Sequence, residues 1–179
     1  MSASTGPRLG HLVLTVRDIA ASHRFYTEVL GFEQCGQLKL PFDADVDMRF
    51  YRGAPDAHHD LALVQSTDPD ANPDVVPFDM FGPRAGVNHV AIEYPTRDAF
   101  LDRLRHLDEL EVPIVVRGNH GMTHSAYIQD PDGNGIEVHY TVPSEFWEGD
   151  VDAALSHFEM LPSSGPDMLI DSTEYVRFG

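Results

Sequence analysis

Residues Gly118 to Tyr140 read GNHGMTHSAYIQDPDGNGIEVHY and gather three histidines and a glutamate around one tight turn. The turn lies at residues 130–135, where proline presets φ and we expect Gly133 and Gly135 to supply positive φ. This pattern predicts a β-hairpin with Tyr127 on its first strand and Glu137 on its second.

The second strand of this hairpin carries a carboxylate among apolar residues. Strand side chains alternate with period two, so Glu137 and His139 share one face, while Ile136 and Val138 lie on the other. A carboxylate in such a setting is costly unless something pairs with it. Glu137 is therefore a candidate ligand, whereas His139 and His124 receive no assigned role.

Composition restricts the class of protein. The chain has 179 residues, enough for one domain with a real core, and its net charge of −17 arises from 29 acidic and 12 basic side chains. This charge disfavours nucleic acid and anionic membranes as partners. The single cysteine excludes an intrachain disulfide, and we see no leader and no apolar run of membrane length. We expect a cytoplasmic protein.

One pattern of strands and helices occurs twice. A strand is followed by a helix that Asp18 caps, and the same order returns later with Thr96 as the cap. The expected strands cover residues 10–16, 32–36, 46–52 and 60–66 in the first copy and 88–94, 112–116, 125–129 and 135–140 in the second. In letters, Gly10-His11-Leu12-Val13 matches Asn88-His89-Val90-Ala91.

The duplication predicts an α+β fold of two tandem β-α-β-β-β modules that form a curved mixed sheet around a central metal cleft. We expect residues 1–179 to be a single domain. Its parts are module one (9–66), a linker or lid (67–86), module two (87–141) and a C-terminal extension (142–179).

The duplicated strands suggest a metal site. His11 and His89 occupy matched positions that face each other across such a cleft, and Glu137 lies on a third strand. Two imidazoles and one carboxylate leave coordination positions open, as in non-haem iron(II) enzymes. The strand at 60–65 carries no carboxylate in its interior that could close the site. We therefore expect His11, His89 and Glu137 to bind Fe(II), with Mn(II) as the alternative ion.

Over roughly residues 10–147 the sequence resembles the vicinal oxygen chelate (glyoxalase/bleomycin resistance/dioxygenase) superfamily and, within it, a one-domain type I extradiol ring-cleaving dioxygenase. His11, His89 and Glu137 match the iron ligands of that family. The resemblance implies insertion of O2, as co-substrate, into a small catecholic substrate.

The resemblance also implies roles for three further residues. His59 matches the acid/base histidine, which would take and return a catechol proton, and His120 and Tyr127 match groups that hydrogen-bond the substrate. We expect His58 to lie on the opposite face of the strand from His59, with little effect on turnover.

Two other functions stay open. A metal-dependent lyase or isomerase of the glyoxalase kind normally uses a fourth protein ligand, and residues 61–64 provide no carboxylate for it. A metal-free small-molecule binding (resistance) protein on the same fold has no need of the three ligands together. Metal analysis and an assay with a simple catechol separate these functions.

The C-terminal extension contains an aromatic pair, Phe146-Trp147, followed by a predicted amphipathic helix around residues 151–160. A single small domain could leave these apolar side chains partly exposed. We therefore expect a homo-oligomer, a dimer or higher.

Overall fold

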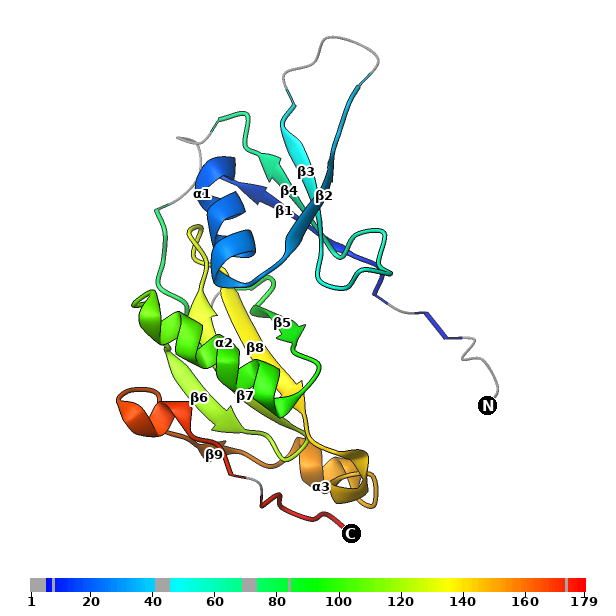
Figure 1. Ribbon diagram of the computed structural model, residues 1–179, viewed down its shortest axis with the longest axis vertical. Helices are drawn as coiled ribbons and strands as arrows, with labels where there is room; N and C mark the ends of the chain where they lie inside the picture. The colour runs from blue at the N-terminus through cyan, green and yellow to red at the C-terminus, as the bar shows by residue number, and fades with distance from the viewer. Residues whose placement is uncertain (1–5, 8, 41–45, 69–73, 84, 173) are drawn as a thin grey trace. The chain divides into compact units, whose positions relative to one another are not determined.

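The computed structural model describes residues 6–7, 9–40, 46–68, 74–83, 85–172 and 174–179. The chain divides into two compact units, Met1–Asp74 and Val75–Gly179. Figure 1 shows a sheet with its own helix in each unit. The division falls inside the predicted linker, of which residues 69–73 and 84 lie outside the described residues. No helix among the described residues has the length and hydropathy to cross a membrane.

The first unit is one mixed sheet with a helix. Its elements are β1 (Leu12–Val16), α1 (Ile19–Arg24), the π-helical turn η1 (Phe25–Val29), β2 (Glu33–Gln37), β3 (Met48–Arg52) and β4 (Leu61–Gln65). The strand order is β1-β4-β3-β2, with β1 parallel to β4 and the other pairs antiparallel. This is the β-α-β-β-β module that the sequence predicted.

Local sequence explains the helical segment of this unit. Asp18 caps α1, because its carboxylate accepts hydrogen bonds from the backbone N–H groups of Ala20 and Ala21 at 2.8 and 3.1 Å. The helical run ends at Gly31, whose φ of 84° favours glycine. Tyr26 and Tyr51 are almost fully buried in the core of the unit.

The second unit repeats this order and extends it. Its elements are β5 (His89–Glu93), α2 (Arg97–Glu109), β6 (Val116–Asn119), β7 (Thr123–Gln129), β8 (Gly135–Thr141), η3 (Ser144–Phe146), α3 (Val151–Leu155), β9 (Glu159–Met160) and η4 (Pro166–Leu169). The strand order is β5-β8-β7-β6-β9, with β5 parallel to β8. The first four strands match the order of the first unit, which confirms the predicted duplication, and β9 is an addition.

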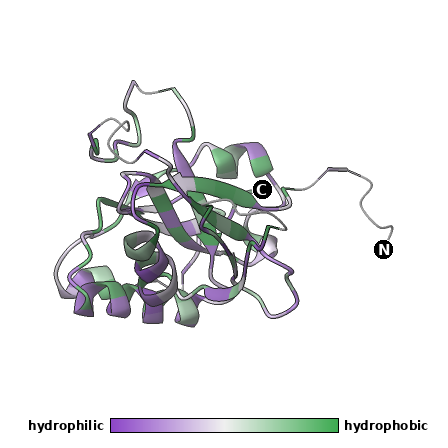
Figure 2. Ribbon diagram, turned by 90° about the horizontal axis from the view of Figure 1, so that it is seen from above, coloured by the Kyte–Doolittle hydropathy of each residue, from purple (hydrophilic) through white to green (hydrophobic). Residues whose placement is uncertain are grey.

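Helix α2 covers one face of the second sheet. Thr96 caps it, and its apolar side chains Phe100, Leu104 and Leu107 are fully buried. The ring of Phe100 lies 5.4 Å from the ring of Tyr140 on β8. Hydrophobic and hydrophilic residues both occur along the helices in Figure 2, as expected for helices with one face on a sheet.

The hairpin of β7 and β8 forms as the sequence predicted. Asp130 organises its turn, since one carboxylate oxygen accepts from the N–H groups of Asp132 and Asn134, at 3.0 and 2.8 Å. Gly133 has the expected positive φ, 88°. The expectation for Gly135 is wrong, because it is not among the residues with positive φ. A Cβ at Gly135 would lie 2.3 Å from the ring of Phe78, so glycine is needed there for close packing.

Two predicted elements are misplaced. The strand expected at 112–116 is β6, Val116–Asn119, because residues after α2 first form a connection in which Glu111 has a φ of 55°. The helix expected around 151–160 ends at Leu155, and Glu159–Met160 instead pairs with β6 as β9. In both cases tertiary pairing overrode the apolar pattern.

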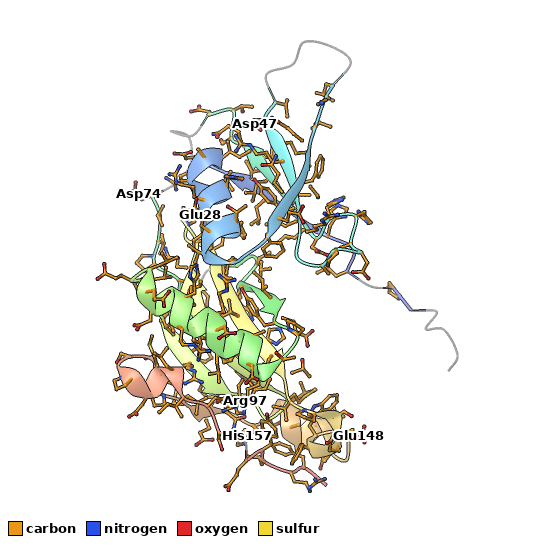
Figure 3. All side chains as sticks on the ribbon, in the orientation of Figure 1. Glu28, Asp47, Asp74, Arg97, Glu148 and His157 are labelled. Atoms are coloured by element: carbon orange, nitrogen blue, oxygen red, sulfur yellow. The ribbon has the colours of Figure 1, made fainter. Side chains whose placement is uncertain are left out.

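Asp171 anchors the C-terminal extension to the α2-covered face. The carboxylate accepts hydrogen bonds from His124 Nδ1 (2.8 Å), the Tyr140 hydroxyl (2.7 Å) and Arg117 Nη2 (3.3 Å). Arg97, labelled in Figure 3 at the start of α2, also donates to the Asp171 carbonyl. Arg117 is completely buried, so Asp171 supplies the negative charge that it needs.

The charge state of Asp171 follows from these partners. Burial alone would raise the pKa of its carboxyl group, but hydrogen bonds from His124 and Tyr140, and then the charges of His124 and Arg117, lower it below the ordinary 3.8. The carboxylate is thus ionised at neutral pH. It contributes stability above pH 3.8 that is lost as the pH falls through the lowered pKa of the folded state.

We predict that Asp130→Ala lowers the free energy of unfolding by about 1–3 kcal/mol, because it leaves the donors of the β7–β8 turn without an acceptor. Asp130→Asn, which keeps one side-chain oxygen, should lose less. Urea unfolding of both variants measures the difference. Equal stability of Asp130→Ala and the wild type would contradict this role of the turn.

Asp171→Asn should cost more, about 3–5 kcal/mol, because it leaves the buried Arg117 charge uncompensated. Asp167→Asn is the matched control, since Asp167 lies on the same extension and is exposed. The wild type should also lose stability more steeply than Asp171→Asn below pH 3.8, where only the wild type must protonate this carboxylate. Parallel pH profiles for the two proteins would refute the assignment.

Candidate metal centre

Each sheet has one face that its helix does not cover, and the predicted ligands lie on those faces. In β5, His89 shares a face with Ala91, which is exposed. In β8, Glu137 pairs directly with Tyr127 of β7, on the side away from Val138 and α2. The period-two alternation of the strands therefore brings His89, Glu137 and Tyr127 to one open face of the second sheet.

His89 and Glu137 meet on this face. His89 Nε2 lies 3.1 Å from Glu137 Oε2, and the Glu137 side chain is only 10% exposed. The pairing follows from the register, in which β5 and β8 run parallel with His89 beside Gly135 and Ala91 beside Glu137. Glu137 does not face bulk water. The structure therefore confirms that this buried carboxylate has a partner.

Asn88 fixes which nitrogen of His89 faces Glu137. The Asn88 amide donates through Nδ2 to the Met80 carbonyl at 2.9 Å, which turns its Oδ1 toward His89 Nδ1 at 2.7 Å. His89 therefore donates its Nδ1–H to Asn88, and Nε2 is the nitrogen that faces Glu137. A lone pair and a carboxylate oxygen 3.1 Å apart repel each other unless a proton or a metal ion neutralises them.

His120 and Tyr127 form a second polar pair on the same face. The Tyr127 hydroxyl lies 3.0 Å from His120 Nε2, and the Tyr127 ring contacts the ring of His89 edge to face at 5.3 Å. Burial, followed by the charge of Glu137, raises the pKa of Tyr127, so the phenol stays protonated. Burial lowers the pKa of His120, which favours its neutral form. Both groups can exchange hydrogen bonds with a polar ligand.

The first unit gathers a histidine cluster around His11. The ring centroids of His11 and His59 are 4.5 Å apart, and Phe50 of β3 packs against His59 at 5.2 Å. Burial, then the neighbouring His11 and His58, lower the pKa of His59. The expectation that His58 lies on the opposite face of the strand from His59 is wrong, because its Nδ1 lies 2.7 Å from His59 Nδ1. The small effect of His58 on turnover stays a prediction. Both residues precede β4 in irregular backbone, where strand alternation does not hold.

The first unit lacks a counterpart of Glu137. Val13, two residues after His11, pairs with Ala62, just as Ala91, two residues after His89, pairs with Glu137. Ala62 thus occupies the equivalent place, and an alanine cannot coordinate a metal ion. The sequence-based expectation of no fourth carboxylate on this strand is supported by the register.

Two of the three predicted ligands have the chemistry of an open metal site. His89 and Glu137 lie together, and an imidazole and a carboxylate suit Fe(II). No three His, Cys, Asp or Glu side chains lie close enough to hold a metal ion within the part of the chain that the structure describes. His11 belongs to the first unit, so the set of His11, His89 and Glu137 remains a prediction that joins one residue of the first unit to two of the second.

Two histidines without a sequence-based role have clear positions. His124 lies on the opposite face from Tyr127 and binds Asp171, so it is structural. His139 lies on the face of Glu137, and its buried Nδ1 has no hydrogen-bond partner among the described residues. Asn88 was missed altogether. The only signal for it in the sequence was its place directly before a candidate ligand.

The aromatic pair of the extension packs within the chain. Phe146 contacts the ring of Tyr175 at 5.1 Å and lies under the guanidinium of Arg177 at 4.8 Å. The indole N–H of Trp147 donates to the Val142 carbonyl at 2.7 Å. The homo-oligomer therefore remains a prediction. Its main argument was an exposed aromatic pair, and these contacts within the chain weaken that argument.

Comparison with characterised proteins gives relatives with several activities. The chain is 28% identical over 149 residues to biphenyl-2,3-diol 1,2-dioxygenase 3 of Rhodococcus globerulus, covering 78% of this chain and 67% of that protein. It is 29% identical over 142 residues to catechol-2,3-dioxygenase of Bacillus subtilis, covering 79% and 44%. It is 30% identical over 149 residues to lactoylglutathione lyase of Pseudomonas putida, covering 74% and 84%. The chain thus spans less than half of the length of the Bacillus enzyme.

A solved structure and a family profile also match this chain. The crystal structure of a glyoxylase/bleomycin resistance protein/dioxygenase domain from Frankia sp. superposes with a TM-score of 0.55 at 20% identity, covering 79% of this chain and 99% of that one. Residues 8–138 match the profile of the Glyoxalase/Bleomycin resistance protein/Dioxygenase superfamily. The chain therefore belongs to this superfamily, known also as the vicinal oxygen chelate superfamily.

Proposed function

We propose that this protein is an Fe(II)-dependent extradiol dioxygenase that cleaves the ring of a small catecholic substrate. The observation that carries the proposal is the pairing of His89 Nε2 with Glu137 Oε2 at 3.1 Å, on the open face beside Tyr127 and His120. Two relatives named as dioxygenases of a catechol and of a biphenyl diol support it.

The residues of the chain have distinct roles in this proposal. His11, His89 and Glu137 hold the metal, and Asn88 orients His89. When bound, Fe(II) supplies the chemistry of O2 activation and a Lewis acid for two adjacent substrate oxygens. Because the set has only three protein ligands, both the substrate and O2 have room beside it.

Proton transfer and positioning fall to three other side chains. His59, whose pKa is lowered by burial and by its histidine neighbours, accepts the proton of a catechol hydroxyl and later returns it. Tyr127 stays protonated and donates a hydrogen bond to a substrate oxygen. His120 holds the Tyr127 hydroxyl in place and contacts the same oxygen pair.

A metal-dependent lyase is the second candidate, and the similarity to lactoylglutathione lyase of Pseudomonas putida favours it. A site of that kind normally uses a fourth protein ligand. Ala62 stands where the register would place a second carboxylate. The lyase proposal is therefore the weaker of the two.

We predict that protein purified without oxygen binds about one Fe(II) per chain. His11→Ala, His89→Ala and Glu137→Ala should each lose the metal and the cleavage of catechol, because each removes one of three ligands. His106→Ala is the control, since this histidine lies partly exposed on α2, away from the open face of its sheet. Metal analysis of the four variants tests the set. Full metal content in all three ligand variants would overturn it, and binding without cleavage would favour the lyase.

His59→Gln should leave the iron content close to that of the wild type and lower kcat by about 10²–10⁴-fold, the usual cost of losing a positioned proton-transfer group. The KM for catechol should change little, because other residues hold the substrate. His106→Gln serves as the control, since His58 touches His59 and is not an independent comparison. Loss of iron from His59→Gln, or equal kcat in the two variants, would show that His59 has another role.

A further inference from the structure

The C-terminal extension reaches the open face of the second sheet through β9. Glu159 and Met160 pair antiparallel with Asn119 and Gly118 of β6. The Leu161 N–H donates to the Arg117 carbonyl at 2.9 Å, which continues the pairing. These backbone bonds fix the position of the residue directly before β9, Phe158. Its neighbour His157 is labelled in Figure 3.

Phe158 lies on the same face as the candidate site. Gly118 pairs with Ser125, which shares its side of β7 with Tyr127. A Cβ added to Gly118 would lie 2.5 Å from the Phe158 ring, so the ring occupies the space that a side chain would fill. The Phe158 ring also lies 5.0 Å from the ring of His120. One aromatic side chain thus touches the sheet and a candidate substrate-binding histidine.

Phe78 makes the matching contact farther along β7. A Cβ added to Gly135 would lie 2.3 Å from the Phe78 ring, which stacks on Tyr127 at 6.3 Å with an interplanar angle of 20°. Gly135 pairs with Gln129, four residues from Ser125. At about 3.3 Å per residue, the two contacts lie about 13 Å apart along the strand.

Along the strands, the two contacts with phenylalanine rings lie on either side of Tyr127 and Glu137. His89 is in register with Gly135, and His120 follows Gly118 by two residues. Both rings come from segments outside the β-α-β-β-β module. Phe158 remains 43% exposed even though its ring packs on Gly118 and His120. An apolar ring that is half open beside a polar row provides a surface on which a planar ligand with a polar edge can lie.

We propose that Phe158 is a wall of the substrate site that positions His120 and limits the size of the substituent that a catecholic ring can carry there. This inference rests on the proposed function and names a positioning and specificity-determining residue of the same site. Asp171 binds His124 and Arg117 on the opposite face of the sheet, so the part of the extension that follows Phe158 is held by β9 pairing and by this anchor.

The test compares a one-ring diol, catechol, with a two-ring diol, biphenyl-2,3-diol, in the iron-loaded protein. Phe158→Ala removes the wall and should raise the ratio of kcat/KM for biphenyl-2,3-diol to that for catechol by at least about tenfold, a typical effect of pocket size. Leu155→Ala, an exposed apolar residue of the same extension, should leave the ratio unchanged.

Two further measurements keep the test independent of turnover. Dissociation constants of both diols, measured by calorimetry without O2, should change in the same direction as kcat/KM. The imidazole NMR signals of His120 should shift in Phe158→Ala, because the ring current of Phe158 is lost, and should stay in place in Leu155→Ala. Gly118→Ala leaves Phe158 intact but displaces its ring, so it should produce the same shift. Phe158→Leu replaces the alanine variant if that variant does not fold.

The outcomes separate the two proposals. If no variant cleaves either diol but the ratio of dissociation constants still changes in Phe158→Ala, the dioxygenase proposal fails and the wall stands. If catechol is cleaved but neither ratio changes and the His120 signals keep their positions, the wall is refuted and the dioxygenase proposal stands.

Discussion

The register between β7 and β8 is the constraint on which the candidate site depends. The Asp130 turn fixes it, and it places Tyr127 directly opposite Glu137. Because strand side chains alternate, a slip of one residue would move Glu137 to the face covered by α2 and expose Val138. On its other edge β8 pairs in parallel with β5, in a register that lets the His89 imidazole reach the Glu137 carboxylate.

The two faces of the second sheet bury polar groups for different purposes. On the α2 side, Arg117, His124, Tyr140 and Asp171 form a paired cluster that joins the extension to the sheet. On the open side, His89 Nε2 faces a carboxylate oxygen with its other nitrogen already committed to Asn88. A paired cluster stabilises a fold, whereas two electron-rich groups facing each other require a proton or a metal ion.

Two phenylalanines from outside the β-α-β-β-β module both pack on the open face of the second sheet. Phe78 precedes β5 and Phe158 follows α3, and each packs on a glycine of the sheet. Gly135 and Gly118 therefore matter for their lack of a side chain, and neither has positive φ. In the first unit, Phe50 stands where Tyr127 stands in the second and packs on His59 instead. The two copies have diverged at matched positions.

The sequence by itself determined the duplicated modules, the caps at Asp18 and Thr96, and the β7–β8 hairpin, because these depend on local propensity and on the alternation of neighbouring side chains. It also placed Glu137 on the face of its strand opposite to Ile136 and Val138. The resemblance to the superfamily, carried by matched residues such as His11, His89 and Glu137, was confirmed by the match over residues 8–138.

Tertiary structure alone decided the start of β6, the strand β9 and the Asp171 anchor. Arg117 and Asp171 are 54 positions apart, and nothing in their local sequence marks either as buried. The apolar run at 112–116 favoured a strand, but the residues that pair with β7 and β9 are Val116–Asn119, two of which are polar. Contacts between distant segments depend on packing and charge compensation, which local patterns do not encode.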